Sequence, residues 1–490
     1  MRLKIKPLKL STGGTFVAVL NKKDASIMDL YPGNRIKIKF DDREIISVID
    51  LTEETVQQGE IGLFEEVLEN IGIKKGYIDV SISEKLRSVY LIRRKLDGKK
   101  LNKKEINEII KDVVNNNLSE VELTYFVSGC YINGLDNNEI INLTKSIVNN
   151  GNKLGLNNKI ILDKHSIGGI PGNRTTMIIV PIIAAAGYLI PKTSSRSISS
   201  PAGTSDTMEV LSEVSFSVEK IKEIVNKTNG CMVWGGAVNL ASADDKLIKV
   251  RNPLSLDPEG MLLASIIAKK AAVNATNVLI DIPIGKNSKI QDKKDAIRLR
   301  NKFIMLASKF NMKIRVMFSD GRQPIGNGIG PGLEAIDVLE VLQGGGSESL
   351  REKSLKIASL MLETVGEKNT IDKVTDILDS GLAYEKMKEI IEAQNGNPNI
   401  KIQDIKIGPY KYAVKSSNSG IIHSINNNII SKIARVAGAP NDKSAGIYLN
   451  VHLNDFVKKN VDLFTIYSKS KEKLDYAKDL FKMSNPILIK

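Results

Sequence analysis

Two polar loops near the middle of the chain carry residue types that bind phosphate. The first follows an apolar run that ends at residue 162, and it reads DKHSIGGIPGNRTT, with Lys164, Ser166 and Gly169 among its residues. A strand that leads through a glycine-rich turn into a helix is a common phosphate cradle, because backbone N–H groups of the turn face the anion. The loop contains neither the Walker pattern nor G-x-G-x-x-G. It therefore predicts an anion site outside the common nucleotide fingerprints.

In the second loop, PKTSSRSISSPAGTSDTMEVL, eleven of the fifteen residues from Thr193 to Thr207 are Ser, Thr, Gly or Ala. Hydroxyls and backbone N–H groups donate short hydrogen bonds to phosphate, and Arg196 adds a planar guanidinium fork. A flexible serine-rich linker is the alternative. The segment that follows resembles a helix start capped by Ser205 or Thr207, and a linker is not expected between a strand and a helix of one sheet.

A third segment, NPLSLDPEGMLLASIIAKKAAV, predicts a helix that begins near Asp257. Ser265 and Lys269 lie four residues apart and share one face of that helix. Asp257 is either an ordinary N-cap or a general acid close to a leaving group. The sequence alone leaves both possibilities open.

The bulk properties narrow the functional classes. The 490 residues suggest about three domains of about 150 residues each, and hydrophobic residues make up 42%. The net charge of +14 comes from lysines scattered beside Glu and Asp, with only 5% aromatic residues, so dedicated nucleic-acid binding is not expected. An RNA-binding protein nevertheless stays as an alternative from another functional class. No run of about 18 apolar residues occurs, and the N-terminus reads as a strand and not as a signal peptide.

Histidine and cysteine usage argues against metal and disulfide sites. The three histidines stand far apart in the sequence, at 165, 423 and 452, and no C-x-x-C is present, so no metal site is expected. Two cysteines, Cys130 and Cys231, make no disulfide framework and suit a reducing cytoplasm.

The elements that must position these loops form a multidomain α/β protein. Short apolar runs at 159–163, 187–192, 277–282 and 313–318 alternate with helical segments, which indicates a mostly parallel sheet. Polar loops follow all four runs, and in such sheets ligands bind beyond the carboxyl ends of the strands. A helix with Ser83 as its cap begins the helical region, and asparagine runs such as 115–117 and 426–428 read as solvated loops. We expect a β-rich N-terminal domain (1–84), a helical domain (85–157, joined by the helix near 257–275), an α/β phosphate-binding domain (158–400) and a small C-terminal α+β domain (401–490).

Together these motifs resemble the thymidine and pyrimidine nucleoside phosphorylase family. The resemblance rests on DKHSIGG, on SSRSISSPAGTSDTMEVL about thirty residues later, and on ASIIAKK. The PGN insertion after the glycines, together with WGGAVNLASADD, LSLDPEG and QPIGNGIGPGLEA, is similar to the AMP phosphorylases of archaeal type. The match runs from about residue 84 to the C-terminus, and the N-terminal β-rich extension resembles that of the AMP branch.

The resemblance implies phosphorolysis of AMP, and of CMP or UMP, to the free base and ribose 1,5-bisphosphate, which in the family leads toward Rubisco. It implies no cofactor, since inorganic phosphate is a co-substrate, and no membrane partner. It also implies a cytoplasmic homodimer or higher homo-oligomer that closes by a hinge. By motif, Asp257 matches the proton donor, and Lys164, Ser166, Ser194 and Thr204 match positions that hold the attacking phosphate. The positions matching AMP contacts are Gly169, Ser195, Arg196, Ser197, Ile198, Ser199, Ser200, Thr204, Ser265 and Lys289.

Two points stay open at the level of sequence. Arg251 falls where pyrimidine phosphorylases contact the base, or it is a surface residue, so base preference is not determined. The remaining alternatives are a pyrimidine nucleoside phosphorylase and a phosphoribosyltransferase of the anthranilate type. The second would use magnesium and pyrophosphate chemistry, for which the sequence offers no acidic pair at a strand end.

Overall fold

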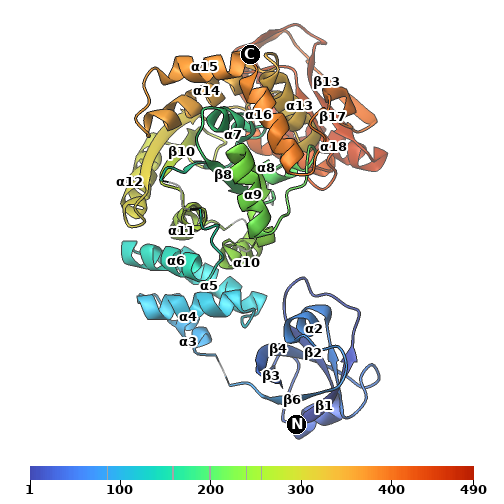
Figure 1. The fold of residues 1–490 in the computed structure, drawn as a ribbon. Coiled ribbons are helices and arrows are strands. Elements are labelled where there is room, and N and C mark those ends of the chain that lie inside the picture. The colour runs from blue at the N-terminus through green and yellow to red at the C-terminus, as the bar shows by residue number, and fades with distance from the viewer. Residues whose placement is uncertain (85, 157–158, 198–199, 239, 255) are drawn as a thin grey trace. The chain divides into compact units, whose positions relative to one another are not determined.

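The computed structural model describes the whole chain except residues 85, 157–158, 198–199, 239 and 255 (Figure 1). The chain divides into two compact units. Unit 1 consists of residues 1–150 and 242–264, and unit 2 consists of residues 151–241 and 265–490. The multidomain α/β fold class predicted from the sequence is confirmed.

The N-terminal part of unit 1 is a closed six-stranded barrel with strand order β1-β5-β2-β4-β3-β6. Alternation of polar and apolar residues produces it: in β1, Leu3 and Ile5 point into the core while their neighbours face outward. Helix α2 ends where Gly72 adopts a left-handed conformation, as its position predicts. The elements of the barrel are β1 (Arg2–Pro7), β2 (Val17–Asn21), α1 (Lys22–Ile27), β3 (Arg35–Phe40), β4 (Arg43–Thr52), β5 (Glu60–Leu63), α2 (Glu65–Ile71) and β6 (Tyr77–Ile82).

The rest of unit 1 is helical, and capping boxes define three of its helices. Asn102, Ser119 and Asp136 each accept a backbone N–H of the first turn, and a glutamate three residues later bonds back to the cap. The predicted cap at Ser83 is wrong, because α3 begins at Arg87 after an extended Leu86. The helices are α3 (Arg87–Leu96), α4 (Lys103–Val114), α5 (Glu120–Asn133), α6 (Asn137–Asn149), α10 (Ser242–Arg251) and the first half of α11 (Glu259–Ala272).

Unit 2 is built on parallel strands. Strands β11-β10-β7 form one sheet and β8-β9 another, and a parallel bridge between Ile161 and Leu189 connects β7 to β8. The carboxyl ends of these strands therefore meet at one edge, as the four polar loops predict. The strands are β7 (Leu162–Ser166), β8 (Ile190–Ser194), β9 (Gly230–Trp234), β10 (Asn277–Ile284) and β11 (Lys313–Asp320).

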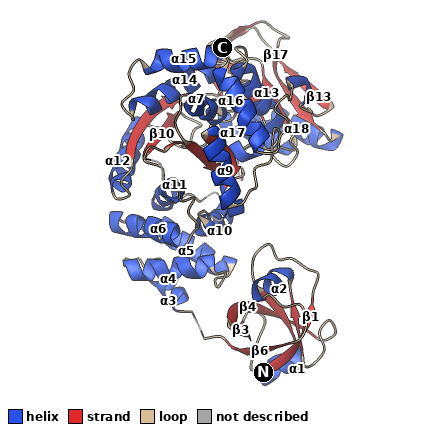
Figure 2. Ribbon diagram, in the orientation of Figure 1, coloured by secondary structure: helices blue, strands red, loops and turns tan. Residues whose placement is uncertain are grey.

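Helices surround these strands (Figure 2). Helix α7 has the sequence TTMIIVPIIAA and is buried from Thr175 to Ala184, so it contributes many residues to the core of unit 2. The helices α14 and α16 pack on it. The helices of this part are α7 (Thr175–Ala185), α8 (Thr204–Met208), α9 (Val218–Thr228), α12 (Lys293–Ser308), α13 (Pro331–Leu342), α14 (Glu348–Glu363), α15 (Thr370–Asp379) and α16 (Leu382–Ala393).

The C-terminal strands are antiparallel and share a sheet with a short strand that precedes α13. The orders are β12-β15-β17-β13 and β16-β14-β18. The expectation that 426–428 is a solvated loop is wrong: Asn426 caps α17, and the fully buried Asn427 donates to the carbonyl of Gly321. The elements are β12 (Gly328–Ile329), β13 (Tyr410–Lys415), β14 (Gly420–Ile425), α17 (Asn427–Val436), β15 (Gly446–Leu449), β16 (Phe456–Val457), β17 (Asp462–Ser468), α18 (Lys471–Ser484) and β18 (Ile487–Ile489).

Candidate active site

The first polar loop leaves the carboxyl end of β7, directly beside β10. The parallel register places Ser166 opposite Asp281, and the Ser166 hydroxyl donates to the Asp281 carboxylate at 2.8 Å. Asn173, from the turn that follows, donates to the same hydroxyl at 3.1 Å. The glycine-rich turn is thus tied to the strand edge by the side chain that sequence reasoning assigned to phosphate.

Lys164 lies at the centre of this edge and is almost completely buried. Its ammonium donates to the hydroxyls of Thr175 (2.8 Å) and Thr176 (3.4 Å), which begin α7. Among the residues that the structure describes, no carboxylate forms an ion pair with it. Burial lowers the pKa of Lys164 well below its usual 10.5, while nearby Asp281 acts to raise it.

The neighbouring buried carboxylates already have cations of their own. Asp163 pairs with Lys270 at 2.7 Å and with Lys192 at 3.5 Å, and Asp281 pairs with Lys353 at 3.0 Å. Burial acts to raise the pKa of both carboxyls, but the neighbouring lysines outweigh it and lower both pKa values. The four lysines of this group outnumber its two carboxylates, and Lys164 forms an ion pair with neither, so a bound anion would match a positive charge that the described residues leave unbalanced.

Gly169 allows the first loop to approach a distant segment. It has φ +104°, and a β-carbon placed there would lie 3.0 Å from the backbone nitrogen of Lys289. Only glycine suits this combination of conformation and close approach. The structure therefore brings together Gly169 and Lys289, two predicted nucleotide contacts that are 120 residues apart in the sequence.

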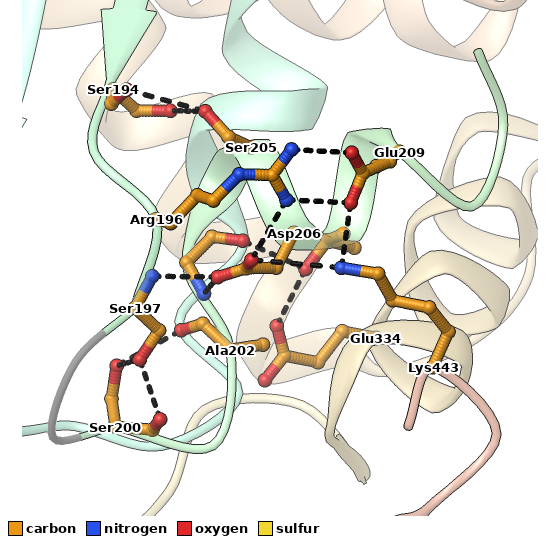
Figure 3. Close-up of polar contacts among 12 residues, drawn as sticks. Ser194, Arg196, Ser197, Ser200, Ala202, Ser205, Asp206, Glu209, Glu334 and Lys443 are labelled. Carbon is orange, nitrogen blue, oxygen red and sulfur yellow. Dashed lines mark hydrogen bonds and ion pairs between the residues drawn. The ribbon is translucent and has the colours of Figure 1, made fainter. Parts of the chain in front are cut away.

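The serine-rich loop follows β8 and is held by its own polar groups (Figure 3). The Ser197 hydroxyl bonds to Ser200, and the Ser200 hydroxyl donates to the carbonyl of Ala202. Ser194 and Ser205 share a hydrogen bond of 2.5 Å across the base of the loop. Two predicted contacts of this loop, Ile198 and Ser199, lie outside the described residues.

Helix α8 closes the loop, although its caps differ from the prediction. It begins at Thr204 after Gly203, so Ser205 and Thr207 lie inside it and are not N-caps. The buried Asp206, at the third position of the helix, accepts the backbone N–H of the cap residue Gly203 (2.9 Å) and also that of Ser197 (2.7 Å). One carboxylate therefore fixes both ends of the loop.

Arg174 is a buried residue that the sequence analysis did not single out. Its guanidinium donates to the carbonyl of Ala202 at 3.0 Å and contacts the Thr204 hydroxyl at 3.5 Å. It forms an ion pair with Glu334 of α13. Arg174 therefore connects the glycine-rich loop to the serine-rich loop.

The structure also shows what surrounds Asp257 in unit 1. Arg251 lies 3.4 Å from its carboxylate and 3.9 Å from that of Asp244. Arg251 is 7% exposed, so the reading of Arg251 as a surface residue is wrong. Ser265 and Lys269 both lie on α11, as predicted.

Three further observations bear on the chemistry. Burial, together with Lys270 and other nearby lysines, lowers the pKa of His165 well below 6.5, so this imidazole is neutral at neutral pH. No group of three or more His, Cys, Asp or Glu residues in the described part of the chain is arranged to hold a metal ion. Within the same residues, no helix has the length and apolar character needed to span a membrane.

The charges that surround Lys164 could have been found only in part from the sequence. Asp281 stands near the end of a predicted strand, which is a usual position for a functional side chain. Lys353 and Lys270 lie within helices, and nothing in their local pattern distinguishes them from solvated lysines.

Comparison with known proteins agrees with this architecture. Residues 89–151 match the helical bundle domain of a glycosyl transferase family, residues 158–384 its a/b domain, and residues 421–488 the pyrimidine nucleoside phosphorylase C-terminal domain. AMP phosphorylase 1 of Archaeoglobus fulgidus is 42% identical over 97% of this chain and 95% of its own length. The AMP phosphorylases of Thermococcus sibiricus and Pyrococcus furiosus are each 44% identical over 100% of this chain and 98% of their own.

The chain belongs to the AMP phosphorylase family.

Solved structures show how far the fold extends beyond that family. Anthranilate phosphoribosyltransferase of Thermus thermophilus matches with a TM-score of 0.51 at 15% identity, over 62% of this chain and 99% of its own. The Saccharomyces cerevisiae enzyme gives a TM-score of 0.52 at 14% identity, over 64% and 99%. These likenesses show a shared fold only. The AMP phosphorylase relatives, by contrast, match the chain from end to end.

Proposed function

We propose that this protein is a pentosyltransferase that cleaves AMP with inorganic phosphate, giving adenine and ribose 1,5-bisphosphate. The observation that carries the proposal is the buried ammonium of Lys164, which donates hydrogen bonds to hydroxyls. The neighbouring lysines Lys270 and Lys353, by contrast, form ion pairs with carboxylates. Full-length relatives named AMP phosphorylases support the same reaction. They favour neither a nucleoside phosphorylase nor an anthranilate-type transferase. CMP and UMP are further substrates in this proposal, and the product feeds a Rubisco pathway.

The reaction requires two anions and one leaving base. A phosphate oxygen forms a bond to C1′ of the ribose while the bond from C1′ to the base nitrogen breaks. Phosphate is a weak nucleophile, so the transition state resembles an oxocarbenium ion, and the electron pair of the broken bond moves onto the base. A proton delivered to the base neutralises that charge.

The residues proposed for the attacking phosphate lie at the edge formed by β7. Lys164 supplies the charge, and the hydroxyls of Thr175 and Thr176 beside it supply hydrogen bonds. Ser166 and Ser194, at the ends of their strands, complete the proposed phosphate site. Because the Lys164 ammonium is desolvated before the anion arrives, its attraction for phosphate is strong.

The nucleotide is assigned to the loops on either side of that edge. The proposed contacts that the structure describes are Gly169, Ser195, Arg196, Ser197, Ser200, Thr204, Ser265 and Lys289; Ile198 and Ser199 are assigned from the resemblance alone. Arg196 and Lys289 are proposed to distinguish AMP from adenosine through the 5′-phosphate. If Arg196→Ala and Lys289→Ala leave the preference for AMP unchanged, that assignment is wrong.

Asp257 is the proposed proton donor to the base. It lies just before α11 in the chain, with its carboxylate beside Arg251. A carboxyl group donates a proton only from its protonated form, so the role requires that substrate binding weakens the contact with Arg251 and desolvates Asp257.

The wider setting is also proposed. The enzyme needs no resident cofactor, forms a homodimer or a higher homo-oligomer, and consists of the four domains 1–84, 85–157, 158–400 and 401–490. A cytoplasmic location is proposed because AMP and phosphate are metabolites of that compartment and because both cysteines are free thiols.

A panel of nucleotides and nucleosides tests the proposed function. Each compound is mixed with the protein in the presence and absence of phosphate, with a metal chelator in both, and free base is measured by chromatography. We expect adenine from AMP only when phosphate is present. Base release that does not depend on phosphate, or turnover of nucleosides but not of nucleotides, would overturn the proposal. RNA binding that weakens with salt, without turnover, would favour the alternative class.

A further inference from the structure

The guanidinium of Arg196 belongs to a cluster of four charges. It forms a two-pronged ion pair with the Glu209 carboxylate, with distances of 2.6 and 2.5 Å, and its charged carbon lies 4.9 Å from the centre of the Trp234 ring. Lys443, from the turn between α17 and β15, lies 2.8 Å from the same carboxylate. Figure 3 shows the two cations facing Glu209, with Asp206 beside them.

The backbone near Lys443 is fixed independently of this cluster. The carbonyl of Lys443 accepts the N–H of Gly332 in α13 at 2.9 Å. The next residue, Ser444, is bonded through its hydroxyl to Asp442 at 2.7 Å. The ammonium of Lys443 is therefore presented to Glu209 from an anchored turn.

The net charge of the cluster is zero only when the ammonium of Lys443 is included. Arg196 and Lys443 are cations, and Asp206 and Glu209 are carboxylates, with Asp206 lying 3.7 Å from Arg196 and 3.6 Å from Lys443. The hydrogen bonds of Arg196, with a further contribution from Lys443, lower the pKa of Glu209 to about 2. Glu209 is thus ionised at neutral pH. Without Lys443 the cluster would carry one net negative charge at the serine-rich loop.

We propose that Lys443 and Glu209 are positioning residues that determine specificity for a phosphorylated substrate. Glu209 holds Arg196 at the loop, and Lys443 neutralises Glu209 so that Arg196 can turn toward a phosphate monoester. When Arg196 makes that exchange, Lys443 stays on Glu209 and keeps the carboxylate paired. The inference rests on the proposed function, in which Arg196 meets the 5′-phosphate, and it assigns a role to residues outside the substrate contacts.

Charge-balanced variants test the inference. The KM for AMP and the inhibition constant of adenosine are measured for Lys443→Met, Lys443→Arg, Glu209→Gln and the double variant Glu209→Gln with Lys443→Met. We expect Lys443→Met to raise the KM for AMP about fivefold or more, because an unbalanced carboxylate repels the phosphate, and to leave adenosine inhibition within about twofold. Lys443→Arg should behave as wild type. The double variant, which removes one charge of each sign, should have a lower KM for AMP than Lys443→Met, because the charge is balanced again although Glu209 no longer holds Arg196.

A matched control separates this effect from general loss of an ion pair. Lys388 pairs with Glu385 on α16 at 2.8 Å, which is the distance found between Lys443 and Glu209. Lys388→Met should change neither constant. Thermal unfolding of each variant identifies any that fails to fold. If Lys443→Met is one of them, Glu209→Gln carries the test: it should raise the KM for AMP and leave adenosine inhibition within about twofold, because Arg196 is no longer held at the loop.

The outcomes separate the inference from the proposed function. An inactive wild-type protein refutes the proposed function. If the wild type is active but Lys443→Met leaves the KM for AMP unchanged, the inference is wrong. It is equally wrong if AMP and adenosine weaken together, or if the second substitution fails to lower the KM below that of Lys443→Met, because both results indicate a purely structural role.

Discussion

Replacing Lys164 with methionine should raise the thermal stability of the protein and lower its affinity for phosphate. Methionine keeps the length of the buried side chain and removes its charge. Because the folded pKa of Lys164 lies below that of the unfolded chain, the charged lysine costs stability at neutral pH. That cost falls as the pH rises from the folded pKa of Lys164 toward its higher unfolded pKa, and it is absent above the unfolded pKa. In phosphate-free buffer at neutral pH, Lys164→Met should therefore unfold at a higher temperature than wild type.

The loss of phosphate affinity follows from the geometry. An anion beside the hydroxyls of Thr175 and Thr176 would lie about 4 Å from the ammonium, where a unit charge contributes about 4 kcal/mol at an effective dielectric constant of about 20. If desolvation of the lysine offsets about half of this, about 2 kcal/mol is left, so the KM for phosphate should rise about thirtyfold. At a phosphate concentration of 100 times the wild-type Kd, wild type gains about 2.7 kcal/mol of stability and the variant less than about 1 kcal/mol.

Calorimetric unfolding with and without phosphate, together with steady-state kinetics, measures both effects. Lys95→Met is the control, because Lys95 is equally buried but pairs with Glu139 at 2.8 Å. Removing one partner of such a pair should cost about 3–5 kcal/mol of stability. The assignment of Lys164 to the phosphate site is refuted if Lys164→Met is destabilised as much as Lys95→Met. It is also refuted if phosphate stabilises Lys164→Met as much as it stabilises wild type.

Three other substitutions or treatments have definite expected results. Asp257→Asn should lower the rate of AMP cleavage about a hundredfold or more, and a rate within about threefold of wild type would exclude Asp257 as the acid. Burial raises the pKa of Asp337 to about 7, so the folded state keeps a proton that the unfolded chain, with a pKa of about 3.9, releases. Stability should fall as the pH rises between those values, and Asp337→Asn should remove that slope in denaturant titrations; an unchanged slope contradicts the assignment. Burial raises the pKa of Cys130 to about 12 and also raises that of Cys231, so neither thiol should react with a disulfide reagent at about pH 8 until the protein unfolds. Rapid labelling of the native protein would show that these thiols are accessible.

The sequence predicted the parallel strands and the helices between them because these elements depend on local patterns of apolar residues. Apolar runs of five or six residues between helical segments were enough to place β7, β8, β10 and β11 and to bring their polar loops to one edge. Capping is less predictable. Gly203 and the side chain of Asp206 close α8 through contacts that depend on the shape of the loop, and the hydroxyl pattern suggested other caps.

The site was predictable where its residues sit at strand ends and hidden where they come from elsewhere. Lys164 and Ser166 belong to the last residues of β7, next to the apolar run that marks the strand, so the sequence reveals their position. Arg174 and Lys443 reach the serine-rich loop and α8 only through tertiary packing, from a turn before α7 and from the turn between α17 and β15. Asn427 resembles a loop residue in the sequence, but it is buried and its side-chain amide donates to the carbonyl of Gly321.

The central claim is that phosphate, and not water, is the nucleophile that attacks C1′ of the ribose and displaces the base. Phosphorus NMR of the protein with AMP and inorganic phosphate follows both reactants and the sugar product in one sample. We predict that inorganic phosphate disappears in step with AMP, and that one product carries two phosphate ester signals, as ribose 1,5-bisphosphate does. Formation of ribose 5-phosphate with inorganic phosphate unchanged would show hydrolysis and would contradict the account.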